Sequence, residues 1–302
     1  MSERKWQAAA QGGKMLTEID RVQLAVTDRQ AAARGWQQLL GAEHVRDDRV
    51  ACLNALRSVY QVGRSEVEFL SPDGTGAIDR ALKERGRPHL FAAGAATPDL
   101  DALVAHVEKQ GTPCHVENGQ AFLTYSQSGH PDLPFVLSDE TARDQVGLIE
   151  RLYEVTILDA DFRTMMDAVT NLFALNEAHY SRITSSHFKY DGYLTLFSPD
   201  DLPRFEVIQP TAPDTTMGRF QGKLGRAFYM AFAETPHILA VEERAKEAGA
   251  GLTVERPEGR KETEMADQLW LHPPALGGMM LGVSRPTMAW SWSGRPERVL
   301  AL

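Results

Sequence analysis

Two glutamates occupy matching places in two similar segments of the chain. Glu68 stands four residues before the proline that ends Val67–Pro72, and Glu206 stands four residues before the proline that ends Phe205–Pro210. Both segments are rich in β-branched and aromatic residues, which predicts strands. A carboxylate that points into an apolar interior is costly unless it is paired or binds a metal. Each glutamate is therefore a candidate metal ligand, general base or ion-pair partner.

An arginine stands near the start of a second pair of similar segments. Arg21 belongs to Ile19–Val26, and Arg151 belongs to Ile149–Val155. We interpret each arginine as the ion-pair partner of the glutamate on a neighbouring strand, because a guanidinium can span that gap with two hydrogen bonds. The alternative interpretation is that Arg21 and Arg151 bind the carboxylate or phosphate group of an anionic substrate.

Two further residues of the second segment can contribute to chemistry or to packing. Tyr153 lies two residues after Arg151 and is predicted to share its face of the strand. It is a candidate proton donor, although an inward tyrosine also serves packing. Glu154 has the opposite phase, so we expect it to point outward or toward an interface between modules.

Four histidines divide into two candidate site residues and two structural residues. His187 and His272 lie near predicted strand ends in the second half of the chain and are candidate metal ligands or bases. His44 and His179 follow the first helix of each repeat at matched positions. Their match indicates a shared structural role at the surface.

Two tryptophans stand one residue apart near the end of the chain. In an extended segment, Trp290 and Trp292 would point to the same side. They would then cover an apolar surface or stack against a bound ligand.

These residues recur because the chain contains a long internal repeat. Each copy is predicted to run strand, helix, three strands, and then strand, helix and closing strands. The sequence divides into an arm at 1–16, a first module at 17–140, a second module at 147–287 and a tail at 288–302. A separate stretch at 210–225 is predicted to be a long loop of the kind that binds or covers a ligand.

Composition limits the classes of protein to which the chain can belong. Its 302 residues are 43% hydrophobic and 24% charged, as in an ordinary soluble globular protein. The net charge of −9 argues against a nucleic-acid surface. We expect no membrane span and no secretory signal, and therefore a cytoplasmic protein. Cys52 and Cys114 are not spaced as a zinc or redox pair and are predicted to be inert thiols.

Several segments together resemble the vicinal oxygen chelate superfamily, which includes glyoxalase I, methylmalonyl-CoA epimerase, extradiol dioxygenases and bleomycin-resistance proteins. The resemblance implies an α+β fold in which tandem βαβββ repeats form paired half-open β-barrels, each facing a concave cavity. It covers nearly all of residues 17–285, and its segments are Ile19–Val26, Ile149–Val155, Phe69–Pro72, Val207–Pro210 and Leu271–Gly282.

The resemblance also implies a divalent metal such as Fe, Mn, Co, Ni or Zn, held by ligands from four strands. This chain departs from that pattern, because only the glutamate position of each module carries a ligand type. Glu206 and Glu68 would be the metal ligands, with His187 or His272 completing the shell. The four positions fall at Arg21, Glu68, Ala92 and Val136 in the first module and at Arg151, Glu206, Met230 and Gly282 in the second.

We favour an isomerase, lyase or ring-cleaving dioxygenase that acts on a small oxygenated organic molecule. Its site would lie in the second module, with Glu206, Tyr153 and Arg151 as catalytic residues and with Arg21, Trp290 and Trp292 as further substrate-binding residues. One alternative is a metal-free protein that sequesters a small molecule, as bleomycin-resistance proteins do. A second alternative is a metal-free enzyme that uses glutamate as base and tyrosine as acid. No nucleotide cofactor is expected, and both a monomer and a homodimer remain open.

Overall fold

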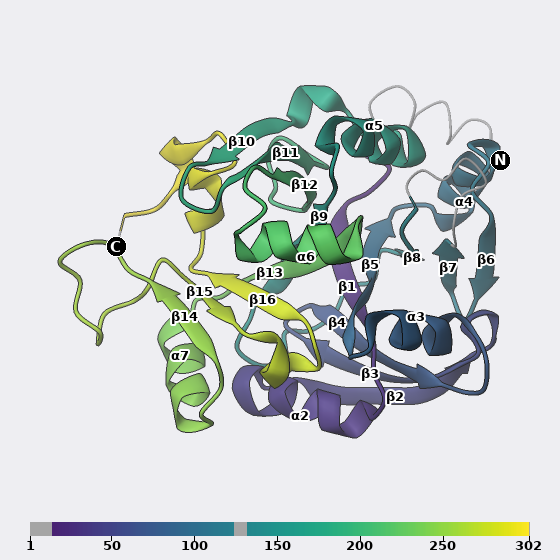
Figure 1. Cartoon of the computed structure of the whole chain (residues 1–302), viewed down its shortest axis with the longest axis horizontal. Coiled ribbons are helices and arrows are strands. Elements are labelled where there is room, and N and C mark those ends of the chain that lie inside the picture. The colour runs from purple at the N-terminus through teal and green to yellow at the C-terminus, as the bar shows by residue number, and fades with distance from the viewer. Residues whose placement is uncertain (1–13, 124–131, 302) are drawn as a thin grey trace. The chain divides into compact units, whose positions relative to one another are not determined.

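The protein is described by a computed structural model over residues 14–123 and 132–301, in which two eight-stranded sheets follow one another along the chain (Figure 1). Residues 1–13 of the predicted arm lie outside the described residues. Residues 124–131, within the predicted closing strands of the first module, also lie outside them.

The first sheet has the strand order β2-β3-β4-β1-β5-β8-β7-β6. Its strands are β1 (Glu18–Ala25), β2 (Glu43–Val50), β3 (Ala55–Val62), β4 (Ser65–Pro72), β5 (His89–Thr97), β6 (Cys114–Glu117), β7 (Gln120–Leu123) and β8 (Phe135–Asp139). The helices in this part of the chain are α2 (Arg29–Leu40), α3 (Ala77–Arg85) and α4 (Leu100–Lys109), and a short 3₁₀ turn, η1 (Ala51–Leu53), links β2 to β3.

The second sheet repeats this order as β10-β11-β12-β9-β13-β16-β15-β14. Its strands are β9 (Arg151–Leu158), β10 (Ser181–Ser185), β11 (Tyr190–Leu196), β12 (Arg204–Pro210), β13 (Ala227–Glu234), β14 (Leu252–Glu255), β15 (Gln268–Leu271) and β16 (Met280–Ser284). The helices are α5 (Phe162–Phe173), α6 (Thr216–Leu224) and α7 (Ile238–Glu247), and the 3₁₀ turns are η2 (Glu177–His179), η3 (Pro273–Leu276), η4 (Met288–Ser291) and η5 (Pro296–Arg298).

The two sheets share their pairing pattern, which confirms the predicted duplication. In the first sheet β1 pairs in parallel with β4 and β5 pairs in parallel with β8, while β2, β3 and β4 are antiparallel neighbours. In the second sheet β13 pairs in parallel with β16, and β10, β11 and β12 are antiparallel. The fold class is therefore α+β, with two half-barrel sheets of eight strands each.

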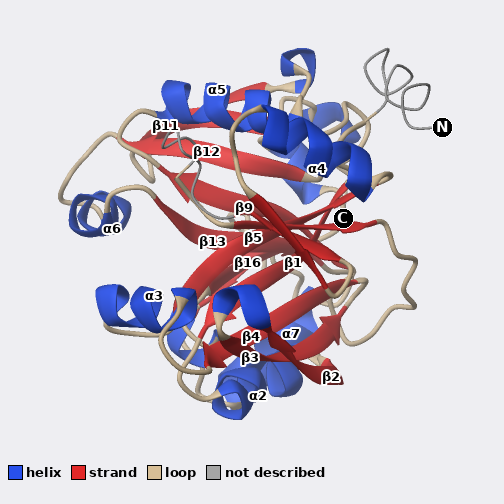
Figure 2. Ribbon diagram, turned by 90° about the vertical axis from the view of Figure 1, so that its right-hand side faces the viewer, coloured by secondary structure: helices blue, strands red, loops and turns tan. Residues whose placement is uncertain are grey.

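Helix α2 shows how local sequence produces these elements. The side chain of Asp28 caps the helix by accepting a hydrogen bond from the Ala31 amide, and Gly41 ends it in the left-handed conformation at φ 74°. Its buried face includes Trp36, whose indole Nε1–H donates to the Leu276 carbonyl at 3.2 Å. This face packs against β3 and β4 (Figure 2).

Helix α5 is built in the same way in the second repeat. Asp161 caps it by accepting hydrogen bonds from the amides of Arg163 and Thr164, and the helix packs against β11 and β12. The rings of Phe173 and Phe205 lie edge-on to the ring of Phe135, at centroid distances of 5.1 and 5.5 Å. Since Phe135 lies on β8, these contacts join α5 and β12 to a strand of the first sheet, while the 5.7 Å centroid distance between Phe173 and Phe205 joins α5 to its own sheet.

Two predictions about irregular segments were wrong. The stretch at 210–225 is not a long loop, because it contains α6, whose first turn is capped by the Thr215 hydroxyl. The tryptophan segment is not extended, since it forms the 3₁₀ turn η4, in which alternate residues do not share a face. None of the described helices is both long and apolar enough to cross a membrane.

The chain forms two compact units that are discontinuous in sequence. One contains the described residues of Met1–Ile19, Ala92–Thr141 and Thr156–Phe228, and the other contains Asp20–Phe91, Ala142–Val155 and Tyr229–Leu302. Each unit therefore combines part of the first repeat with part of the second along the chain.

Candidate functional site

The glutamate of the first sheet is enclosed by three hydrogen-bond donors. Glu68 is fully buried, and its Oε1 accepts a hydrogen bond from Arg21 Nη1 at 2.9 Å. Its Oε2 accepts from Gln23 Nε2 at 2.7 Å and from Arg57 Nη1 at 3.2 Å. The predicted ion pair between Arg21 and Glu68 is therefore confirmed.

Strand register creates this cluster. In the parallel pair of β1 and β4, Arg21 stands opposite Glu66 and Gln23 stands opposite Glu68. The Arg21 guanidinium also contacts Glu66 at 2.9 Å and Asp20 at 2.5 Å. Burial by itself lowers the pKa of Arg21, but the carboxylates around it outweigh that effect and raise its pKa above the usual range. The arginine is a permanent cation in this cluster.

The arrangement around Glu68 does not fit a metal ion. Both of its oxygens already accept hydrogen bonds from cationic or amide donors. Arg21, which stands at the position of a histidine ligand, has donors and no acceptor lone pair with which to coordinate a metal. This part of the first sheet is held together by an ionic cluster. A metal ion could bind Glu68 only by displacing an arginine.

The residue equivalent to Arg21 in the second repeat is Glu154, not Arg151. Arg21 is the fourth residue of β1 and Glu154 is the fourth of β9, and each stands seven residues before the aspartate that caps the next helix, Asp28 or Asp161. The predicted match with Arg151 was wrong, because it relied on a similar tripeptide and not on the distance from strand to cap. Glu154 is 1% exposed, which excludes only the outward orientation of the two that we expected for it.

The charge at two equivalent positions is exchanged between the sheets. Where β1 carries Arg21 and β4 carries Glu66, β9 carries Glu154 and β12 carries Arg204. Both members of the second set are buried, with Arg204 fully enclosed. The two repeats therefore place buried charges at the same strand positions with opposite signs.

The glutamate of the second sheet is bound by a hydroxyl. Glu206 is 7% exposed, and its Oε2 accepts a hydrogen bond from Thr156 Oγ1 at 2.6 Å. Thr156 is the sixth residue of β9, as Gln23 is the sixth of β1. A short neutral donor thus stands beside this carboxylate where the first sheet has a glutamine.

An aromatic cluster gathers around Phe232 on β13. The ring centroid of Phe232 lies 6.1 Å from that of Tyr153, 6.5 Å from that of Trp270 and 6.4 Å from that of Trp292. A Cβ added at Gly282, its partner on β16, would lie 2.2 Å from a ring carbon of Phe232. The ring therefore fills the space into which a metal ligand at position 282 would extend, so this position does not fit a metal either.

Tyr153 takes part in packing and in one hydrogen bond. It is fully buried, and its hydroxyl lies 3.1 Å from Ser284 Oγ. Arg151, at the start of β9, is half-buried. Trp290 is 7% exposed, and the Arg298 guanidinium lies 4.6 Å from its ring centroid. Trp292 is more accessible and contacts Phe232.

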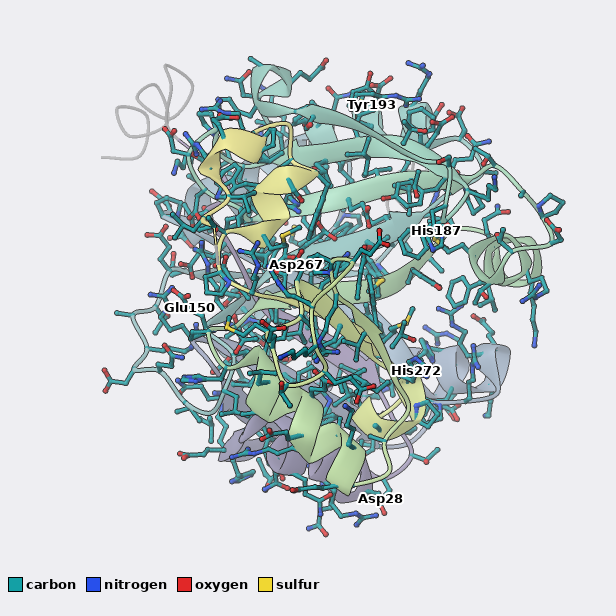
Figure 3. The ribbon with its side chains drawn as sticks, turned by 90° about the vertical axis from the view of Figure 1, so that its left-hand side faces the viewer. Asp28, Glu150, His187, Tyr193, Asp267 and His272 are labelled. Carbon is teal, nitrogen blue, oxygen red and sulfur yellow. The ribbon has the colours of Figure 1, made fainter. Side chains whose placement is uncertain are left out.

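Each of the two candidate histidines makes a contact of its own. His187 is exposed in the turn between β10 and β11 (Figure 3). Its ring centroid lies 4.6 Å from that of Phe188. His272 lies before η3, and its Nε2 is 2.9 Å from Thr253 Oγ1 (Figure 3). Neither histidine forms a described contact with Glu206 or Glu68.

Sequence reasoning missed three residues that shape these sites. Gln23 and Thr156 occupy the strand positions next to the two glutamates, and their shared phase was the available signal. Phe232 was missed because its importance depends on pairing with a glycine of a distant strand, which no local pattern reveals.

Solved structures share this fold, although no protein-family model and no curated protein matches the chain. A triple mutant of 4-hydroxymandelate synthase from Streptomyces coelicolor is 12% identical, with a TM-score of 0.69 over 89% of this chain and 92% of that one. A xylose isomerase-like TIM barrel/4-hydroxyphenylpyruvate dioxygenase fusion protein is 10% identical, with a TM-score of 0.59 over 89% of this chain and 49% of that one. The chain thus spans about half of the fusion protein. The chain shares the fold of these structures, and its α+β arrangement of two half-barrel sheets is the fold class that the sequence predicted.

Proposed function

We propose that the protein is an enzyme that acts on a small oxygenated organic molecule, with Glu206 as its general base. The observation that carries the proposal is the contrast between two equivalent carboxylates. Glu68 is fully enclosed by arginine and glutamine donors, whereas Glu206 keeps 7% of its surface accessible and has the neutral Thr156 hydroxyl beside it. A buried carboxylate that keeps a small accessible surface is suited to proton transfer.

The similar structures support an enzyme on this fold. Their names denote a synthase and a fusion protein that includes a dioxygenase. With identities of 12% and 10%, the likeness concerns the fold, so the reaction of this chain rests on its own residues. The surroundings of Glu68 and of Gly282 do not fit a metal at these matched strand positions, which favours isomerase or lyase chemistry over oxygen chemistry there.

In such a reaction, the Glu206 carboxylate takes a proton from a carbon next to a carbonyl group. The electron pair of the broken C–H bond moves toward the carbonyl oxygen to give an enolate. An isomerase then returns a proton to the enolate, and a lyase instead expels a leaving group from the adjacent carbon. Arg151, Tyr153 and Trp292 belong to the other compact unit, so the proposed step assigns them no role beside Glu206.

The proposed reaction needs no metal held by the strand positions. At Glu68 the donors are already in place, and at Gly282 the Phe232 ring fills the space. His187 and His272 remain proposed ligands only for a metal that Glu206 would help to hold. Activity that persists in the presence of a chelator would distinguish the metal-free reaction from a reaction that uses such a metal.

The test is hydrogen–deuterium exchange at carbon, followed by proton NMR in D₂O. The substrates are a panel of 2-oxo acids, 2-hydroxy acids and α-hydroxyketones, incubated with the full-length protein and a chelator. We expect exchange on at least one substrate, reduced about 100-fold or more in Glu206→Gln. Glu68→Gln is the matched control, and its exchange rate per folded molecule should stay near that of the parent.

Three results would contradict the proposal. Exchange that appears only after Fe²⁺, Mn²⁺, Ni²⁺ or Zn²⁺ is added, with bound metal lost in Glu206→Gln, would establish metal chemistry instead. Stoichiometric binding of a substrate that is released unchanged would establish a sequestering protein. Equal loss of exchange in the folded Glu68→Gln and Glu206→Gln variants would remove the distinction on which the proposal rests.

A further inference from the structure

A cleft of about 600 Å³ opens where α2 begins beside β2, β3 and β4. This volume lies in the range of small-molecule sites. Among the residues that line it are Asp28, Arg29, His44, Asp47, Ser58 and Tyr60. Side chains alternate along a strand, so Ser58 and Tyr60 lie on the face of β3 opposite to Arg57 and its ionic contact with Glu68. The cleft is therefore distinct from the glutamate cluster.

Asp47 holds the polar wall of the cleft in place. Its Oδ1 accepts hydrogen bonds from Arg29 Nη1 at 3.1 Å and from the Ser58 hydroxyl, and its Oδ2 lies 3.1 Å from His44 Nε2. Arg29 Nη1 also donates to Ser58 Oγ at 2.8 Å. The Ser58 hydrogen bond, supported by His44 and Arg29, lowers the pKa of Asp47. These contacts direct the Arg29 and His44 side chains along the wall of the cleft.

Three polar groups of the cleft have capacity left for a ligand. The Tyr60 hydroxyl has no hydrogen-bond partner among residues 14–123 and 132–301 and is open to solvent, while its ring is packed against His44 and Phe69. Within the same ranges, Arg29 uses only Nη1, which leaves its Nε–Nη2 edge open. Asp28 uses Oδ1 to cap α2 through the Ala31 amide, which leaves Oδ2 as an acceptor.

The charges of the cleft select between classes of ligand. The guanidinium edge of Arg29 matches a carboxylate, which it can bind with two parallel hydrogen bonds. Asp28 and Asp47 bring two carboxylates against this one cation, so a simple anion is disfavoured. A simple cation would in turn face the guanidinium and the positive end of the α2 dipole. A molecule that carries both charges satisfies both sides.

We propose that this cleft binds a small zwitterion, a free α-amino acid. Its carboxylate lies on the Nε–Nη2 edge of Arg29 and accepts a hydrogen bond from the Tyr60 hydroxyl. Its ammonium group donates to Oδ2 of Asp28. This site is separate from the proposed chemistry at Glu206 and does not depend on it.

Isothermal titration calorimetry on the full-length protein tests the ligand class. Each of the common α-amino acids is titrated, together with the 2-hydroxy acid and the amine that share its side chain. We expect one-to-one binding of at least one amino acid, with its hydroxy acid and its amine bound about tenfold more weakly or worse. Absence of amino-acid binding, or equal binding of the hydroxy acid, the amine or a neutral polyol such as glucose, overturns the proposal.

Substitutions then place the ligand in the cleft. Tyr60→Phe removes only the hydroxyl and should weaken binding about fivefold, and Arg29→Lys should weaken it about tenfold because a lysine lacks the paired edge. Asp28→Asn keeps a good helix cap but loses the negative charge. It should therefore weaken the binding of the amino acid about tenfold without lowering the melting temperature of the protein. Asp161→Asn, the same change at the cap of α5, is the matched control. Equal weakening by Asp161→Asn, or none by Tyr60→Phe and Asp28→Asn, overturns the site.

Discussion

The central strands of the two sheets put different chemistry on the same scaffold. In the first sheet, Glu68 is surrounded by Arg21, Gln23 and Arg57 and has no accessible surface. In the second, Glu206 has the Thr156 hydroxyl as a neighbour and remains partly accessible. Since the strand order is the same, the difference lies in the donors on the neighbouring strands. The contacts of Glu68 are those of a structural anion, and the neutral donor beside Glu206 is what the proposed base at this position rests on.

A second difference concerns the pair of strands next to these. Gly94 on β5 stands opposite Val136 on β8, whereas Phe232 on β13 stands opposite Gly282 on β16. The large and the small residue have changed places between the repeats. Only the second arrangement places an aromatic ring at the centre of a cluster with Tyr153, and that ring occupies the space at the last metal-ligand position.

The largest effect is expected from breaking the first-sheet cluster. Arg21→Met should lower the free energy of unfolding by about 3–5 kcal/mol, because it removes the buried guanidinium that Asp20, Glu66 and Glu68 share. Arg57 beside Glu68 and Arg143 beside Glu66 would remain as partial counter-ions. Thr156→Val in the second sheet should cost only about 1–2 kcal/mol, since it removes one hydroxyl donor. Urea unfolding of both variants measures the difference.

A rescue variant sharpens this prediction. Adding Glu68→Gln to Arg21→Met removes one of the stranded charges and should restore part of the lost stability. Equal costs for Arg21→Met and Thr156→Val would show that the two glutamates have the same surroundings in solution, and the contrast drawn from their contacts would then be wrong.

The sequence predicted most of the fold because the repeat, the helix caps and the strand pattern are local signals. Asp28 and Asp161 precede amphipathic segments, and both cap the helices expected there. The pairing of Arg21 with Glu68 was also accessible, since a buried carboxylate requires a partner. The predicted module boundaries remain predictions. The compact units of the structure each combine parts of both repeats, so they do not test those boundaries.

The surroundings of Glu206 were harder to predict, because similar short sequences do not establish which residues of two strands are equivalent. The tripeptides that contain Arg21 and Arg151 look alike, but the distance to the helix cap shows that Glu154 is the true equivalent. A shift of three residues turns a side chain to the opposite face of a strand. The role of Thr156 beside Glu206 could be seen only after that register was fixed.

A titration at the start of β5 distinguishes the two sheets. Burial, aided by Arg85 and Arg87, lowers the pKa of His89 to about 4 from the ordinary 6.5, despite its hydrogen bond with the Arg87 carbonyl. The folded state therefore prefers the neutral ring. Its contribution to stability is fully present above pH 6.5 and is lost as the pH falls through 4, with a total of about 3 kcal/mol. The first residue of β13, at the equivalent place, is Ala227, which does not titrate.

His89→Asn is the variant that isolates this effect. Urea unfolding of parent and variant between about pH 7.5 and pH 4 measures the difference in their free energies of unfolding. Carboxylates titrate in both proteins, so they largely cancel in that difference. The parent's advantage should shrink as the pH falls below 6.5, and a difference that stays constant down to pH 4 would show that His89 is protonated normally in the folded protein.

A smaller effect than that of Arg21→Met is expected at Gly282, where a substitution tests why the second sheet carries no metal ligand at this position. The Cβ of Gly282→Ala would lie 2.2 Å from the Phe232 ring, so the ring must move, at a cost of about 1–3 kcal/mol in the free energy of unfolding. Phe232→Leu should cost less in the Gly282→Ala background than in the parent, because the clash is then already relieved. Gly222→Ala in α6 is the control, since its Cβ meets nothing within 4 Å. Full additivity of Gly282→Ala and Phe232→Leu would show that the ring does not occupy this space, and a carboxylate at position 282 would then again be compatible with a metal.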